Sequence, residues 1–228
     1  MSEGSRLHVL VTGGAGYIGS HTAVALHAAG FWPVLLDNLD NASVEAVAGV
    51  REICQADLPF HQIDVRDGAL LDKLFSDLES RGTPLQGILH FAAHKAVGES
   101  VEQPARYASN NVGGLAVLLE AASKHGVDDV VFSSSCTVYG EPPSVPVSES
   151  APLQAAESPY GWTKQACERV LTDHATFHRL HHSGAGLHRL HQDFKKVFFT
   201  NNQVSKSPPA NAFSNVASKF EKNTDAHT

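Results

Sequence analysis

The sequence predicts an α/β fold, a doubly wound parallel sheet with helices on both faces. Strand-like and helix-like segments alternate along about the first 170 of the 228 residues, which is typical of such sheets. A glycine-rich turn joins the first expected strand to the first expected helix, and an acidic residue ends the second strand. The expected strands are 7–12, 33–37, 59–64, 86–92 and 129–134, and the expected helices are 17–29, 43–54, 68–81, 110–125 and 160–174.

The glycine turn follows an apolar run of strand length and reads Gly13-Gly14-Ala15-Gly16-Tyr17-Ile18-Gly19. In a dinucleotide site, Gly13 would permit the tight turn, Gly16 would let the backbone approach a pyrophosphate, and Gly19 would let helix and strand pack closely. The helix that begins at Tyr17 would offer free N–H groups and its dipole to the phosphates. The glycine spacing is one residue looser than the commonest form, so the turn alone is weak support.

Asp37 ends the second expected strand, 18 residues after Gly19. This is close to where an acidic residue accepts a hydrogen bond from an adenosine ribose. Asp37 would repel a 2′-phosphate and its neighbour Asn38 offers no cation, so we expect NAD rather than NADP. The alternative is a chance glycine turn followed by an ordinary surface aspartate. Because strand, turn, helix, strand and acid occur in that order, we favour the dinucleotide site.

Tyr160 and Lys164 lie four residues apart, and they would share one face of a helix. An ammonium close to a phenol favours the phenolate, which would lower the pKa of Tyr160 from ~10 and allow it to act as a general base. The hydroxyl of Ser135 could share the moving proton. This spacing occurs by chance in many helices, so its support comes from the glycine turn in the same chain.

The candidate residues share one position, the carboxyl end of an expected strand. Gly13 follows the first strand, Asp37 ends the second, Asp64 the third, Ala92 the fourth and Ser135 the fifth. Ligands of doubly wound sheets bind beyond the carboxyl ends of the strands. The shared position therefore predicts one site more strongly than any single motif does.

Composition argues against several other classes of function. The net charge is −7, and residues 1–177 hold 10 Lys and Arg against 21 Asp and Glu, which argues against a nucleic-acid partner. No apolar run reaches membrane-spanning length, and residues 1–6 lack the form of a signal peptide. The three cysteines fit neither a paired framework nor a metal spacing. We therefore expect no membrane partner and a cytoplasmic location.

The sequence changes character near Thr176. We expect a nucleotide-binding domain over 1–175 and a divergent tail over 176–228, first His-rich and then polar, which is poorly ordered. His174 and His178 could bind a metal from one helix face. No carboxylate or cysteine spacing completes such a site, so we expect no metal.

Beyond these patterns, the chain resembles the UDP-glucose 4-epimerase family of extended short-chain dehydrogenases/reductases over about residues 7–175. The run from His94 to Ser100, His-Lys-Ala-Val-Gly-Glu-Ser, is highly specific for this family, whereas the glycine turn is not. The matching stretches are 11–22, 37–39, 91–100, 110–112, 133–140 and 158–164.

The resemblance implies a Rossmann-type NAD-binding domain and an isomerase of galactose metabolism. Its substrates would be UDP-glucose and UDP-galactose, interconverted through a transient 4-keto sugar. Tyr160 would take the proton of the sugar 4-hydroxyl, Lys164 would lower the Tyr160 pKa and hold the nicotinamide ribose, and Ser135 would relay the proton. Further NAD contacts are implied for Asp64 at the adenine, for Phe91, Ala92, Lys95 and Asn110 along the nicotinamide side, and for Val65, Ala93 and Ser133.

Two of these implied contacts have an equally good explanation from the residues alone. Asp64 would also suit a turn at the end of a strand, and Lys95 would also suit a solvated surface position. Related sugar-nucleotide dehydratases carry an Asp-Glu pair where Cys136 and Thr137 stand here. Because elimination of water needs that acid and base, dehydration is disfavoured.

Members of the resembled family are longer, with a second domain that binds the UDP-sugar, and the sequence beyond Thr176 does not resemble it. We therefore expect a truncated form. One alternative is a catalytically silent NAD-binding or dimer-forming remnant, and another is a different NAD-dependent sugar-nucleotide oxidoreductase. The family's dimer helices would match 101–125 and 160–175, so a homodimer is implied.

Overall fold

A five-stranded parallel sheet forms the centre of the molecule, whose computed structural model describes residues 6–148 and 150–181. Its strand order is β3-β2-β1-β4-β5. The chain moves outward from β1 through β2 to β3 and then crosses to β4 on the other side of β1, so the strand order reverses between β1 and β4. This confirms the predicted Rossmann-like sheet, whose ligand site lies at such a reversal. The strands are β1 (His8–Thr12), β2 (Trp32–Asp37), β3 (Phe60–Gln62), β4 (Leu85–His90) and β5 (Val130–Phe132).

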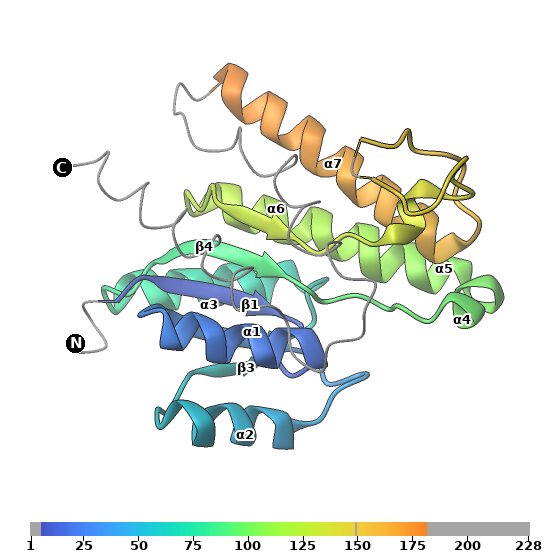
Figure 1. Cartoon of the computed structure of the whole chain (residues 1–228). Helices are drawn as coiled ribbons and strands as arrows, with labels where there is room; N and C mark the ends of the chain where they lie inside the picture. The colour runs from blue at the N-terminus through green and yellow to red at the C-terminus, as the bar shows by residue number, and fades with distance from the viewer. Residues whose placement is uncertain (1–5, 149, 182–228) are drawn as a thin grey trace.

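Helices cover both faces of this sheet (Figure 1). Helices α1 (Tyr17–Ala28) and α2 (Val44–Cys54) pack on one face, and α3 (Gly68–Ser80) and α6 (Gly114–Lys124) pack on the other. The last helix, α7 (Pro159–His181), lies along α6 (Figure 1). Shorter elements are α4 (Val97–Glu102), α5 (Pro104–Tyr107), a π-helical segment (Ala108–Gly113) and a 3-10 turn (Cys136–Tyr139).

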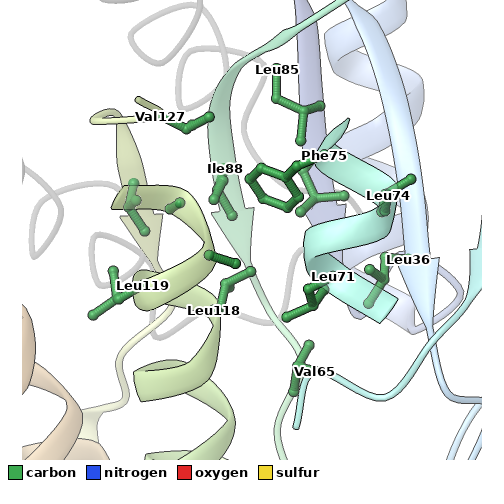
Figure 2. Close-up of a cluster of buried hydrophobic side chains, with 14 of the residues drawn as sticks. Leu36, Val65, Leu71, Leu74, Phe75, Leu85, Ile88, Leu118, Leu119 and Val127 are labelled. Carbon is green, nitrogen blue, oxygen red and sulfur yellow. The ribbon is translucent and has the colours of Figure 1, made fainter. Parts of the chain in front are cut away.

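Alternate strand residues divide the core into two layers, because neighbouring side chains of a strand point to opposite faces. In β1, Val9 and Val11 join the layer beneath α1 and α2, whereas Leu10 joins the layer beneath α3 and α6. In the second layer, Phe75 from α3 is 2% exposed and lies near Ile88 of β4 (Figure 2). Both faces of the sheet are therefore buried, as a parallel sheet requires.

The main difference from prediction is the helix expected over 110–125. Helical structure begins earlier, at Val97 in α4, and passes through α5 and a π-helical segment before α6. Pro104 stands at the start of α5 and separates it from α4, since proline suits a first helical turn but not an interior. The π-helical segment contains Asn111, whose buried side chain bonds to two distant parts of the chain, and such contacts give no periodic signal.

The other element boundaries differ by a few residues. The third strand ends at Gln62, so Asp64 lies two residues beyond it rather than at its end. The fourth and fifth strands likewise end at His90 and Phe132, earlier than predicted. The last helix continues past the predicted end at 174 to His181. These ends depend on tertiary pairing, which a local pattern does not report.

The predicted tail over 176–228 lies mostly outside the described residues, as do His182, His188 and His191 of the histidine-rich run. The predicted boundary at 175 stays a prediction, and α7 runs across it. His174 Nε2 lies 3.2 Å from Ser123 Oγ, a contact between α7 and α6. The side chain of His178, the second candidate metal ligand, also lies outside the described residues. Among the side chains of residues 6–148 and 150–176, no group of three His, Cys, Asp or Glu has an arrangement suited to a metal. No helix in that part is long and apolar enough to cross a membrane.

Candidate functional site

A cavity lies at the carboxyl ends of β1, β2 and β4, where the strand order reverses. The structure brings most of the predicted cofactor residues to its walls, from segments more than one hundred residues apart. Tyr160, Lys164, Ser135 and Asp64 are not among the lining residues. The predicted residues that line it are Gly13, Gly16, Tyr17, Ile18, Gly19, Asp37, Asn38, Val65, Phe91, Ala92, Ala93, Lys95, Asn110 and Ser133.

The glycine turn forms one wall of this cavity, and its geometry explains the glycines. Gly13 has φ +69°, and a Cβ atom there would lie 2.7 Å from Ala92 N. A Cβ atom at Gly19 would lie 2.1 Å from Gly13 O, so the start of α1 packs directly on the turn. Gly16 is the N-cap of α1 and supplies no side-chain cap. The first N–H groups of α1 are thus left for an anion, which suits a pyrophosphate.

Asp37 is held at the end of β2 by the backbone around it. Its carboxylate accepts from Ala15 N at 3.1 Å and from Leu39 N at 2.9 Å, and the residue is 8% exposed. The first bond ties the end of β2 to the glycine turn. A carboxylate has about four acceptor positions, so two remain for a ligand on the cavity side. This arrangement suits the ribose hydroxyls of a dinucleotide. The Asp37 carboxylate would repel a 2′-phosphate on that ribose.

Asp64 is occupied by protein partners. Its carboxylate accepts from Arg66 Nη2 at 2.6 Å and from Asn38 Nδ2 at 3.2 Å. The Arg66 guanidinium holds the pKa of Asp64 well below its usual range, because it stabilises the charged form. Asp64 thus links Asn38 to Arg66, as a turn residue would. Its implied contact with the adenine stays a prediction. Lys95 is exposed at the cavity wall. This position suits both an NAD contact and a solvated surface lysine.

Tyr160, Ser135 and Lys164 lie next to the cavity at the junction of β5 and α7. Ser135 lies close enough to the Tyr160 side chain to lower the pKa of its phenol against the effect of burial. Lys164 Nζ donates to Ser133 O at 2.7 Å, and Ser133 itself lines the cavity. Thr137 Oγ1 donates to Ser135 Oγ at 3.0 Å. The predicted trio is therefore assembled, with Ser135 between Thr137 and the phenol.

The surroundings of Tyr160 and Lys164 shift the pKa of both side chains. Burial raises the pKa of Tyr160, and the nearby Ser135 side chain lowers it by less. The Lys164 ammonium donates to the Ser133 carbonyl and lies 5.9 Å from the centre of the Tyr160 ring, and its effect on the phenol pKa stays a prediction. Burial also lowers the pKa of Lys164 to about 8.

Several side chains that position the site were not predicted. Asn111 Nδ2 donates to His94 O and to Thr163 Oγ1, each at 3.0 Å. It thereby joins the cavity wall to α7, and Thr163 Oγ1 donates in turn to Tyr160 O at 2.7 Å. Ser100 Oγ accepts from Tyr160 N at 3.1 Å. Asn111 and Ser100 stand within the stretches that carried the family resemblance, which is the signal that was available for them.

Other residues that line the cavity were also not predicted, and one of them is Asp40. Its carboxylate pairs with Arg106 at 2.8 Å, and Arg106 also pairs with Glu99 at 2.8 Å. These ion pairs tie the segment after β2 to α4 and α5. No local pattern signals such pairs, which join residues far apart in the sequence. The additional lining residues are Leu36, Asp40, Asn41, Ala42, Ile63 and His94.

Comparison with known families is consistent with this geometry. The model of the family described as GDP-mannose 4,6 dehydratase matches residues 10–197. A UDP-glucose 4-epimerase from Neisseria meningitidis is 47% identical over 166 residues, which are 73% of this chain and 48% of that protein. A UDP-glucose 4-epimerase from Bacillus subtilis is 48% identical over 165 residues, or 72% and 47%. The chain thus spans about half the length of the curated relatives it matches.

Solved structures give the same result for the fold. A UDP-glucose 4-epimerase from Stenotrophomonas maltophila, with bound NAD and formylated UDP-arabinopyranose, superposes with a TM-score of 0.70 and 41% identity. The match covers 75% of this chain and 49% of that one. The enzyme from Bifidobacterium longum, in complex with NAD+ and UDP, has a TM-score of 0.70 and 39% identity. The chain belongs to the GDP-mannose 4,6 dehydratase family, and its matched part is similar to the N-terminal part of UDP-glucose 4-epimerases.

Proposed function

We propose that the chain binds NAD in the cavity at the ends of β1, β2 and β4. The observation that carries this proposal is Asp37, a buried carboxylate at the cavity wall that is bonded to the glycine turn. Ribose hydroxyls would meet Asp37, and the pyrophosphate would meet the uncapped start of α1. Phe91, Ala92, Ala93, Lys95 and Asn110 would line the nicotinamide side. The relatives that were solved with NAD support this assignment.

We further propose that the site performs the chemistry of a UDP-sugar 4-epimerase and acts on UDP-glucose and UDP-galactose, in galactose metabolism. Tyr160 would take and return the proton of the sugar 4-hydroxyl, with Ser135 as the relay. Lys164 would hold the nicotinamide ribose and, together with the cationic nicotinamide, favour the phenolate. Bound NAD would accept a hydride from the sugar and return it to the other face.

Two other functions compete with this one. One is a catalytically silent chain that binds NAD without turnover, in which nothing positions the sugar for reaction. A different NAD-dependent sugar-nucleotide oxidoreductase would use the same proton relay. Dehydration stays disfavoured, since Cys136 and Thr137 offer no acid and base pair.

The deciding experiment compares the purified 228-residue chain with Tyr160→Phe. We expect both proteins to bind NAD with equal affinity by calorimetry. The wild type should convert UDP-galactose to UDP-glucose at least about a hundredfold faster, the usual contribution of a positioned acid–base group. Absence of turnover above the Tyr160→Phe level, with NAD still bound, would establish the silent alternative. Net release of NADH with substrate would instead establish the oxidoreductase.

The remaining proposals are a homodimer and a cytoplasmic location. The dimer would form through the helices near 101–125 and 160–175, which include α6 and α7. Sedimentation at micromolar concentration should give twice the 24.3 kDa chain mass, and a mass of one chain would contradict the dimer. Three free thiols, at Cys54, Cys136 and Cys167, suit a reducing compartment.

A further inference from the structure

Helix α7 buries two opposite charges where it meets the end of β5. Lys164 is 4% exposed and Glu168 is 7% exposed, and the two residues stand one turn apart on the same helix face. Burial of a charge is costly unless the charge is paired or hydrogen-bonded. Two buried charges beside a candidate relay therefore need an explanation beyond packing.

These two side chains hold consecutive residues of the segment that leads to Ser135. Lys164 Nζ donates to Ser133 O at 2.7 Å, and Ser134 Oγ donates to Glu168 Oε1 at 2.6 Å. One bond fixes a backbone carbonyl and the other fixes a side chain. Because Ser135 follows directly, its hydroxyl is positioned by the same contacts.

The other titratable groups that face Lys164 are uncharged near neutral pH. Burial lowers the pKa of His90, on β4, to about 3, and it raises the pKa of Cys167, on α7, to about 11. Burial likewise raises the pKa of Tyr160. Cys167 and then Glu168 raise the pKa of Lys164 against the larger effect of burial. Glu168 is the carboxylate among these facing groups, and it lies one helical turn from Lys164.

We propose that Glu168 is a positioning residue of the site, whose carboxylate fixes the Ser133–Ser135 segment through Ser134 and stands one helical turn from Lys164 as its counter-charge. Its catalytic consequence rests on the proposed function, but its effects on Lys164 and on the serine segment do not. A neutral polar group at this position would satisfy Ser134 and yet leave Lys164 without a counter-charge.

Two substitutions separate the two roles. Glu168→Gln keeps the shape and an acceptor for Ser134 but removes the charge, so the Lys164 pKa should fall by about one unit or more. Glu168→Asp keeps the charge, so the Lys164 pKa should stay close to that of the wild type. Ser134→Ala keeps the charge and removes the hydrogen bond, so it should leave the Lys164 pKa nearly unchanged. Glu120→Gln, which removes an exposed carboxylate from α6, is the matched control.

The Lys164 titration is measured by NMR on the 228-residue chain with ¹³C-labelled lysine, and the signal is assigned by its loss in Lys164→Met. An unchanged Lys164 titration in folded Glu168→Gln overturns the proposal. Should Glu168→Gln fail to fold, Ser134→Ala decides by hydrogen exchange. The Thr137 amide, which donates to Ser135 Oγ at 3.3 Å, should exchange several-fold faster, and unchanged exchange overturns the proposal.

Turnover is a second measurement, and it distinguishes failure of the Glu168 proposal from failure of the proposed activity. If the wild type converts UDP-galactose, Glu168→Gln should move the alkaline loss of activity to lower pH, because Lys164 then loses its proton earlier. Ser134→Ala should lower kcat without that shift. Absence of turnover in the wild type counts against the proposed activity alone, since the Lys164 titration and the Thr137 exchange are measured without substrate.

Discussion

Gly19→Ala should destabilise the protein by about 2 kcal/mol or more and remove NAD binding. The added Cβ would lie 2.1 Å from Gly13 O and 2.9 Å from Gly14 Cα. Both contacts are with backbone, so α1 and the glycine turn must separate, and overpacking of this kind costs about 1–3 kcal/mol or more. The same movement displaces the N–H groups that would meet the pyrophosphate. Urea unfolding and calorimetry with NAD measure the two effects.

Gly49→Ala supplies the control for this substitution. Gly49 lies inside α2, and a Cβ there meets no atom within 4 Å. Alanine should therefore stabilise the protein by up to about 1 kcal/mol, the usual difference in helix propensity, and leave NAD affinity unchanged. Equal stability of Gly19→Ala and the wild type would contradict the close approach of α1 to the turn.

Asp37→Ala should weaken NAD binding by about tenfold to a hundredfold and lower the free energy of unfolding by about 2 kcal/mol. The affinity estimate corresponds to one charge-assisted hydrogen bond of about 1.5–3 kcal/mol. The stability estimate follows because Ala15 N and Leu39 N lose their acceptor in a buried position. Calorimetry with NAD and urea unfolding test the two numbers separately.

Asp57→Ala removes the same charge from a side chain that is 91% exposed and paired with Arg51 at 3.2 Å. Its stability should stay within about 0.5 kcal/mol of the wild type, and its NAD affinity should not change. If Asp37→Ala binds NAD as tightly as Asp57→Ala does, Asp37 is not the ribose acceptor.

The sequence predicted those parts of the fold that depend on local chemistry. Strand-like and helix-like segments alternate along the chain, and their apolar patterns predicted the five strands and the main helices. Each pattern shows which side of a strand or helix must be buried. The glycine turn was identifiable because Gly13 needs a positive φ and Gly19 tolerates no side chain. Asp37 was identifiable because a polar residue ended a continuous apolar strand.

Other features could not be predicted because they depend on contacts between distant segments. The π-helical segment contains Asn111, whose side chain bonds to His94 and Thr163. The Arg106 ion pairs join α5 to the segment after β2, 66 residues away. Neither feature has a period or a short motif that a single sequence displays.

The sequence by itself determined the order of the elements, the glycine turn, Asp37 and the presence of Tyr160, Lys164 and Ser135. Only the tertiary structure decided how those three residues act together. Helix spacing places Lys164 beside Tyr160, but burial against β5 turns its ammonium to Ser133 O. The same packing puts Glu168 next to Ser134. The protonation of the site is therefore set by burial and distant partners, which the spacing of residues does not encode.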